Sequence, residues 1–150
     1  MGVLIDTCIW IDVEQGRIGP GDVASLTGDE PVYLSPVTLA ELKLGAELAP
    51  DPGTRQKRLR TWRRMLHKPL LAIDAGTAEV FGDLAAVLTT GNRRGHRTRV
   101  QDLWLASQAV QHGFKLLTRH SDDFADIPGL DLLLVDLPMH SATGRINATP

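Results

Sequence analysis

The sequence predicts an α/β fold in which helices cover both faces of a parallel sheet. Short apolar runs recur along the chain, and segments with helical periodicity lie between them. Strands that alternate with helices in this way are typical of parallel sheets, whose faces are both buried. The chain has 150 residues, of which 43% are hydrophobic and 23% charged. This composition matches one globular domain with a core of its own.

Five apolar runs are predicted to form the strands of this sheet. Each is brief and mostly apolar, as a buried strand requires. In chain order they are residues 3–5, 32–35, 70–73, 115–118 and 132–135. Open α/β sheets bind ligands at the carboxyl ends of their strands, close to helix N-termini. Candidate functional residues are therefore expected where these runs end.

Three further segments have helical patterns, at residues 37–49, 75–88 and 101–114. In the second of them, apolar side chains recur at helical spacing: Phe81, Leu84, Ala85 and Leu88. The chain has no apolar run long enough to cross a membrane and no pattern typical of a signal peptide. Cys8 is the only cysteine, which excludes an internal disulfide framework and a cysteine-rich zinc site. We therefore expect a cytoplasmic protein.

Asp6 ends the first predicted strand, in the stretch GVLIDTCIWID. On this stretch alone the simplest interpretation is a helix N-cap, since a carboxylate accepts hydrogen bonds from the free N–H groups at a helix start. The alternative is a functional carboxylate at the edge of the sheet.

Glu41 falls on an apolar stripe of its predicted helix, together with Val37, Leu44 and Leu48. A carboxylate on such a stripe costs several kcal/mol unless it is paired, hydrogen-bonded or bound to a metal. The alternative is a capping box, because Thr38-x-x-Glu41 has the required spacing. Both interpretations remain open at this point.

Asp102 repeats the pattern at the start of the helix over residues 101–114. A polar side of that helix is expected at Gln108, Gln111 and His112, whereas Asp102 falls with the apolar Leu105, Ala106 and Ala109. The alternative is that Asp102 only complements the helix dipole from the first turn, which is worth a few tenths to about 1 kcal/mol.

Taken together, these three acids suggest a metal site. Clustered carboxylates repel one another, and a hard divalent cation can hold them ionised side by side. Oxygen ligands without a nearby His and Cys pattern favour Mg²⁺, or Mn²⁺, over Zn²⁺. Such an ion activates water and neutralises the charge that develops on a phosphoryl group.

Two basic segments suggest a polyanionic partner, although the net charge is −2. Residues 55–68, RQKRLRTWRRMLHK, contain no acid, and residues 93–99, RRGHRTR, follow later in the chain. The alternative for each segment is an ordinary solvated surface.

Four segments occur in an order that resembles PIN-domain ribonucleases, and most closely the VapC toxins of bacterial toxin–antitoxin pairs. They are LIDTCIWID, LSPVTLAELKLGAEL, VQDLWLASQAV and LLTRHSDDFADIPGLDLLLV. The resemblance covers residues 2–136. It implies a PIN domain over residues 1–136, with a three-layer fold and a five-stranded parallel sheet, followed by a loosely ordered tail over residues 137–150.

The resemblance also implies roles for several residues. Asp6, Glu41 and Asp102 match acidic active-site residues of the family, with Asp6 and Asp102 as metal ligands, and Thr118 matches its hydroxyl residue. The chain departs from the family where a fourth acid commonly follows the Thr-Arg pair, because His120 stands there. Asp123 is expected to supply the missing acid, with Asp122 as the alternative. The other interpretation is that both aspartates only cap the turn that follows. His120 is expected to contact a phosphate.

The function implied by the resemblance is that of a Mg²⁺-dependent endoribonuclease toxin. It would cleave single-stranded regions of structured RNA, such as tRNA or rRNA, through metal-activated water. Its partners would be the RNA and a VapB-type antitoxin, in a homodimer or a toxin–antitoxin hetero-oligomer without a membrane. The alternative is a catalytically weak PIN-like protein that mainly binds its antitoxin in a DNA-bound complex. Two arginine triplets are expected to hold RNA: Arg58, Arg63 and Arg64, and Arg93, Arg94 and Arg97.

Overall fold

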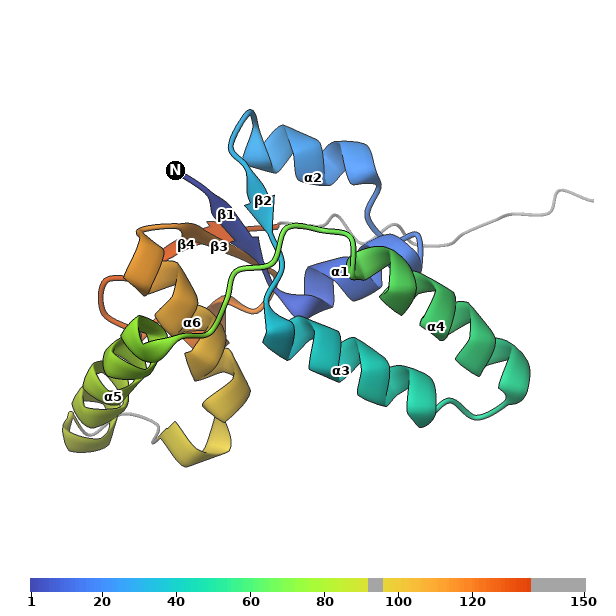
Figure 1. Cartoon of the computed structure of the whole chain (residues 1–150). Helices are drawn as coiled ribbons and strands as arrows, with labels where there is room; N and C mark the ends of the chain where they lie inside the picture. The colour runs from blue at the N-terminus through green and yellow to red at the C-terminus, as the bar shows by residue number, and fades with distance from the viewer. Residues whose placement is uncertain (92–95, 136–150) are drawn as a thin grey trace, which may run out of the picture.

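The computed structural model describes residues 1–91 and 96–135, in which helices pack on both faces of one parallel sheet (Figure 1). The α/β fold predicted from the sequence is thereby confirmed. The predicted tail, residues 137–150, lies outside the described residues. No described helix is both long and apolar enough to cross a membrane.

Within the described residues the sheet has four strands in the order β2-β1-β3-β4, and every neighbouring pair is parallel. Their bounds are Val3–Ile5 for β1, Val32–Tyr33 for β2, Lys115–Thr118 for β3 and Asp131–Leu134 for β4. The chain leaves β1 towards β2 on one side and later returns to β3 on the other. The boundary between β1 and β3 is therefore the switch point where open α/β sheets bind ligands.

Side chains that alternate along β1 separate the two layers of the core. Val3 and Ile5 pack with α1, Thr7–Glu14, and α2, Pro20–Thr27. Leu4 points to the opposite face and packs with helices from later in the chain. Those helices are α5, Ala75–Thr90, α6, Val100–His112, and the short α7, Ser121–Phe124, and a 3-10 turn, His96–Thr98, precedes α6.

The predicted strand at residues 70–73 is reduced to a single bridge between Leu70 and Leu34 in the described structure. The pairing cannot continue because the neighbouring segment begins α3 at Pro36, which has no N–H to donate to the next carbonyl, that of Leu71. Gln108 Nε2 donates to this carbonyl instead, at 2.5 Å. The expectation that Gln108 marks a polar surface was wrong, since the residue is fully buried. Its Oε1 accepts from the Ser35 hydroxyl at 2.6 Å, so both ends of the amide are satisfied in the core.

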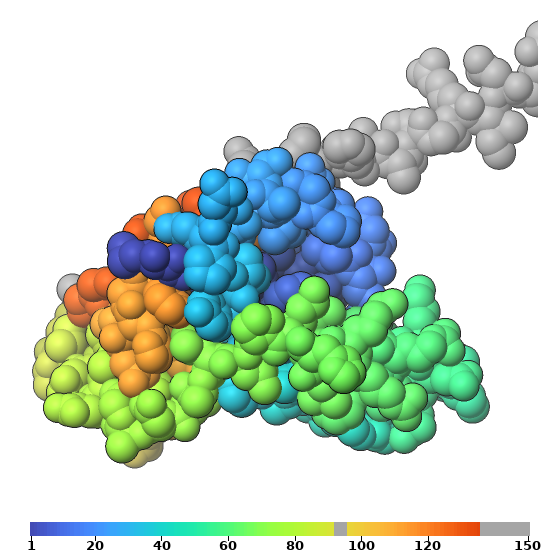
Figure 2. Space-filling view, turned by 45° about the horizontal axis from the view of Figure 1, so that its top comes forward, coloured from blue at the N-terminus to red at the C-terminus, as the bar shows by residue number. Residues whose placement is uncertain are grey.

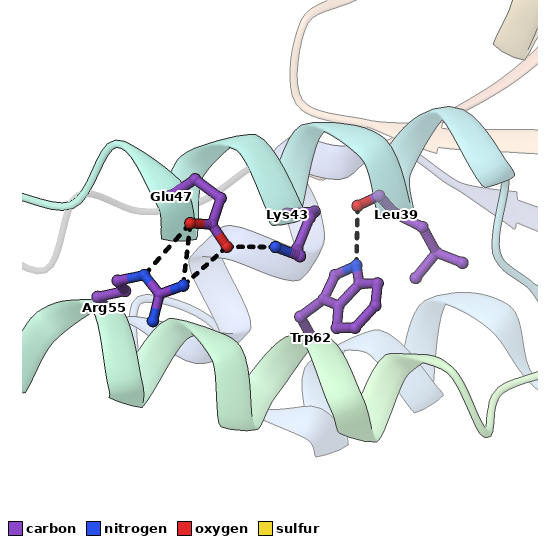
Figure 3. A network of polar contacts seen from close by, with 5 residues as sticks. All are labelled: Leu39, Lys43, Glu47, Arg55 and Trp62. Carbon is purple, nitrogen blue, oxygen red and sulfur yellow. Dashed lines mark hydrogen bonds and ion pairs between the residues drawn. The ribbon is translucent and has the colours of Figure 1, made fainter.

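Helices α3, Pro36–Glu47, and α4, Pro52–Met65, form an antiparallel pair that projects from one side of the molecule (Figures 1 and 2). Figure 3 shows how they are tied together. Trp62 Nε1 on α4 donates to the Leu39 carbonyl on α3 at 3.0 Å. Glu47 pairs with Lys43 on its own helix and with Arg55 on α4.

The apolar stripe expected on α3 is buried only at its start. Leu44 is 56% exposed and Leu48 72% exposed. Both lie towards the far end of α3, where the helix extends beyond the sheet and has α4 alongside it (Figure 1). The prediction that these two leucines face the core was therefore wrong, and only Val37 packs against the main core cluster.

Candidate active site

Asp6 lies at the carboxyl end of β1, at the switch point of the sheet, and is only 6% exposed. Its Oδ1 accepts from the Thr7 backbone N–H at 2.7 Å, so the side chain does cap α1. Its Oδ2 accepts from the Thr118 hydroxyl at 2.8 Å and from the Cys8 thiol at 3.4 Å. The capping interpretation therefore accounts for one oxygen, and the other is held from β3.

Cys8 is unsuited to act as a nucleophile beside this carboxylate. Burial and the negative charge of Asp6 raise the pKa of its thiol to about 11. The thiol therefore stays protonated near neutral pH and serves as a weak hydrogen-bond donor.

Glu41 does not cap its helix, so the capping-box alternative was wrong. The N-cap of α3 is Ser35, whose hydroxyl accepts from the Val37 N–H at 3.1 Å. Thr38 is buried instead and accepts from the Thr7 hydroxyl at 2.9 Å. Glu41 lies in the second turn of α3, half-buried beside α1.

The electrostatic environment of Glu41 places it near the other two acids. Burial raises its pKa most, and the negative charges of Asp6 and Asp102 raise it further, while the Thr7 hydroxyl opposes the rise. Such mutual destabilisation is expected of carboxylates gathered around one point.

Asp102 lies in the first turn of α6 and faces the same point. Burial raises its pKa to about 6, and the charges of Asp6 and Asp123 contribute to the rise, whereas Arg99 and His120 oppose it. A helix dipole acting alone would lower the pKa of an acid in the first turn. Burial and neighbouring acids therefore dominate at Asp102, and the dipole is a secondary effect.

The segment after β3 adds a hydroxyl, a histidine and a fourth acid. Thr118 is fully buried, and its Oγ1 accepts from the His120 N–H at 3.1 Å while donating to Asp6. Asp123 and His120 both lie close enough to Asp102 to act on its pKa. Asp122 is exposed. Both aspartates lie in the first turn of α7, whose N-cap position is His120, so neither occupies the capping position.

Sequence reasoning missed Arg99, which anchors the segment that carries Asp123. Its side chain is 4% exposed and forms two 2.8 Å hydrogen bonds to the carboxylate of Asp126. Its Nη2 also donates to the Asp123 carbonyl at 2.5 Å. An arginine at the end of a basic run gave no sign of this role, because both of its partners lie more than twenty residues later in the chain.

Sequence reasoning also missed Asp12, a fully buried carboxylate on α1. Arg17 approaches its Oδ1 at 3.1 Å, and Arg119 approaches its Oδ2 at 3.1 Å. The second contact is an ion pair without hydrogen-bond alignment, since Asp12 Oδ2 has no hydrogen-bond partner. The signal was present, because Asp12 shares the buried side of α1 with Ile9. Two arginines balance this acid, which distinguishes it from the site acids.

The carboxylates fit a divalent cation by their chemistry. They offer hard oxygen donors that raise one another's pKa, which a cation would relieve. Over residues 1–91 and 96–135, however, no three His, Cys, Asp or Glu side chains already lie close enough to enclose a metal ion. Asp6 and Asp102 are the residues that would hold such an ion.

The first basic segment divides between two sides of α4. Arg58 faces α3, where its Nη1 donates to the Gly45 carbonyl at 2.8 Å. Arg63 and Arg64 are exposed, as is Arg60. In the second segment Arg97 is exposed, whereas Arg93 and Arg94 lie outside the described residues.

Comparison with known families gives a match over most of the chain. The family described as "PIN domain" matches residues 3–130. The ribonuclease VapC4 of Mycobacterium tuberculosis is 30% identical over 132 residues, which are 88% of this chain and 95% of that protein. The ribonuclease VapC of Rickettsia bellii is 27% identical over 137 residues, covering 91% of this chain and 98% of that protein.

Solved structures with this fold include toxin–antitoxin complexes. The VapBC-5 complex of Mycobacterium tuberculosis contains a chain that is similar with a TM-score of 0.69 and 27% identity, over 89% of this chain and 98% of that one. The DNA-bound VapBC of Salmonella typhimurium contains another, with a TM-score of 0.74, 21% identity and coverage of 88% and 96%. At 21% identity, the similarity to the Salmonella chain shows a shared fold only.

Proposed function

Because the chain belongs to the PIN-domain family and is related to its VapC ribonucleases, we propose that it is a metal-dependent endoribonuclease that acts as the toxin of a toxin–antitoxin pair. The observation that carries this proposal is the placement of Asp6, Glu41 and Asp102. These residues come from a strand end and two different helices, yet their charges act on one another at the switch point of the sheet. A phosphodiesterase that uses a divalent cation needs carboxylates in such an arrangement.

Each acid has a distinct role in this proposal. Asp6 and Asp102 would hold Mg²⁺ or Mn²⁺, with Glu41 and Asp123 orienting the attacking water. When bound, the ion supplies a more acidic water and neutralises the charge that develops on the phosphate. Thr118 holds Asp6 Oδ2 in place through its 2.8 Å hydrogen bond. His120, which is exposed beside Asp102, is available to donate to a phosphate oxygen of the substrate.

The substrate we propose is a single-stranded region of a structured RNA, such as tRNA or rRNA. Exposed arginines on α4 and at Arg97 would contact its phosphates. Among the related structures are VapBC complexes, so a VapB-type antitoxin is the proposed protein partner. The proposed assembly is a homodimer or a toxin–antitoxin hetero-oligomer. The proposed location is the cytoplasm, because the proposed RNA substrates are found there.

Cleavage of RNA by the purified toxin, freed from its antitoxin, tests the proposal. Cleavage is expected with Mg²⁺ or Mn²⁺, is expected to stop with EDTA, and is expected to return when the metal is added back. The variant Asp6→Ala should cleave no RNA while keeping its helical circular dichroism, because it removes a ligand at the rim of the core. Cleavage that continues unchanged in EDTA, or in Asp6→Ala, would contradict the metal-dependent mechanism.

The same preparation tests the alternative function. The His120 position keeps that alternative open, because a fourth acid commonly stands there in the family. A wild-type protein that binds its antitoxin and promoter DNA but cleaves no RNA with any divalent metal would favour a binding role. Restoring the acid with His120→Asp would then be expected to raise cleavage.

A further inference from the structure

A cavity of about 180 Å³ lies between α1, α3 and α4, next to the acidic site. Glu41 borders both, since it lines the cavity and responds to the charges of Asp6 and Asp102. None of the roles assigned above uses the rest of the cavity.

The cavity continues the active site along the seam between two helices. On α1, Thr7, Ile11 and Glu14 are spaced by four and three residues and therefore share one face. One face of α3 carries Thr38, then Glu41 and Leu42, and then Gly45, again at intervals of three or four residues. The Thr7 and Thr38 hydroxyls meet at 2.9 Å beside the acids. From there both faces lead to Glu14 and Gly45, and α4 closes the far side.

The size of the cavity suits one ring system. An apolar cavity of about 150 Å³ admits a benzene-sized ring, whereas drug-sized ligands occupy roughly 300–1,000 Å³. At about 180 Å³, the cavity can take a single base but not a whole nucleotide. The sugar and phosphate would therefore remain outside, on the side of Glu41.

Its chemistry combines apolar walls with a fixed acceptor. Ile11 and Leu42 provide aliphatic surface for the faces of a ring. Glu14 is held by the Thr61 hydroxyl, which donates to its Oε1 at 3.0 Å. A carboxylate has about four acceptor positions, so this hydrogen bond leaves Glu14 able to accept more. Arg58 adds one positive charge to a wall that also carries the carboxylates of Glu14 and Glu41.

We propose that this cavity binds one nucleobase of the RNA strand, next to the phosphate that is cleaved, and that it prefers guanine. Guanine carries two neighbouring N–H donors, at N1 and N2, which match the two oxygens of a carboxylate such as Glu14. Uracil places carbonyl oxygens on both sides of its single N–H, and these would face the carboxylate. This inference rests on the proposed ribonuclease function and adds a specificity site to it.

The test uses short single-stranded RNAs that differ only in one base beside the cleaved bond: guanine, hypoxanthine, adenine or uracil. Hypoxanthine lacks the N2 amine and isolates that contact. A good bidentate base contact is worth roughly 5- to 150-fold in discrimination, so kcat/KM is expected to favour guanine by a factor in that range. In Glu14→Gln, the preference for guanine over hypoxanthine and uracil should shrink to about twofold or less.

A second variant fills the cavity without disturbing the helix. A Cβ added at Gly45 meets nothing within 4 Å, so Gly45→Leu should fold and project into the cavity. We expect it to raise KM for every RNA in the set. The matched control is Gly82→Leu on α5, where an added Cβ also meets nothing within 4 Å. Gly82 does not line the cavity, so this variant should leave KM and base preference unchanged.

The possible failures are distinguishable. A wild-type protein that cleaves RNA without base preference, or variants at Glu14 and Gly45 that keep the wild-type preference and KM, would overturn this inference and leave the ribonuclease function standing. Loss of antitoxin affinity in Gly45→Leu with unchanged RNA kinetics would overturn it in favour of a protein-docking cavity. If the wild type cleaves no RNA with any divalent metal, the proposed function fails and this inference fails with it.

Discussion

The Thr118 hydroxyl donates a hydrogen bond to the Asp6 carboxylate across the boundary between β3 and β1, with 2.8 Å between Oγ1 and Oδ2. Thr118 is fully buried, and Asp6 is nearly so. This contact fixes one oxygen of the carboxylate that we propose as a metal ligand. It also connects the ends of two strands that are far apart in the sequence.

Thr118→Val keeps the shape of the side chain but removes this donor. Leaving a buried acceptor without its hydrogen bond costs about 1–3 kcal/mol. Since 1 kcal/mol corresponds to roughly 2–4 °C in a chain of this size, the melting temperature should fall by a few degrees or more. Cleavage should fall as well, because Asp6 is freed to turn. Thr118→Ser is the control that keeps the hydroxyl and should keep more activity than Thr118→Val; the reverse order would contradict a role for the hydrogen bond.

Glu41→Gln separates a site residue from a structural one. Because Ser35 caps α3, the substitution should cost no helix cap. Burial and like charges raise the pKa of Glu41, so a neutral side chain should leave the metal-free protein as stable as wild type or slightly more stable. Cleavage with Mg²⁺ should fall by at least about tenfold, which corresponds to 1.4 kcal/mol in the barrier. Full activity together with a lower melting temperature would show a structural role instead.

The raised pKa of Asp102 predicts how stability depends on pH in EDTA. Its pKa in the folded protein is about 6, against 3.8 for the free group. The folded state therefore holds this proton more tightly, and the contribution to stability is lost as pH rises from about 4 to about 6. Asp102→Asn removes the effect. Its melting temperature relative to wild type should thus increase between about pH 4.5 and pH 7, by roughly 2–4 °C if the screened effect is about 1 kcal/mol. A difference that is constant over this range would contradict the raised pKa.

Asp12 and Arg119 are expected to position the segment around Thr118 and His120. Arg119→Gln leaves the buried Asp12 with one cation, and the loss of a hydrogen-bonding or ionic partner there should cost about 1–3 kcal/mol. Arg17→Gln is the matched control, because Arg17 pairs with the other oxygen of Asp12 but belongs to the chain after α1. Both variants should lower the melting temperature, whereas only Arg119→Gln should lower kcat below the melting transition. Equal kcat values would show that the ion pair serves stability alone.

The exposed side of α4 is expected to hold RNA phosphates. Changing Arg60, Arg63 and Arg64 together to Gln should weaken RNA binding and make its salt dependence shallower by about 2, since each phosphate contact on a single strand contributes about 0.7 to the slope. Arg55→Gln is the control, because Arg55 is paired with Glu47 on α3. Arg97→Gln tests the second basic segment separately. If binding and slope stay unchanged in both the triple variant and Arg97→Gln, the RNA path lies elsewhere.

The amino-acid sequence sufficed for the fold class, for four of the strands and for the position of the acids near strand ends and helix starts. These features follow from local periodicity, because a buried strand or an amphipathic helix needs apolar residues at fixed spacing. The β3 strand occupies Lys115–Thr118, as its apolar run predicted. The same local spacing drew attention to Asp6, Glu41 and Asp102.

Only the tertiary structure decided which polar groups are hydrogen-bonded or ion-paired and which apolar side chains are buried. Gln108 is buried because Ser35 and the Leu71 carbonyl satisfy its amide, and both lie far away in the sequence. Leu44 is exposed because α3 extends past the sheet, although its spacing matches an inward stripe. Asp12 can be buried because Arg119, which comes directly after β3 and is far away in the sequence, forms an ion pair with it. Periodicity describes one element at a time, whereas the free energy of burying a side chain depends on the partners that the fold brings to it.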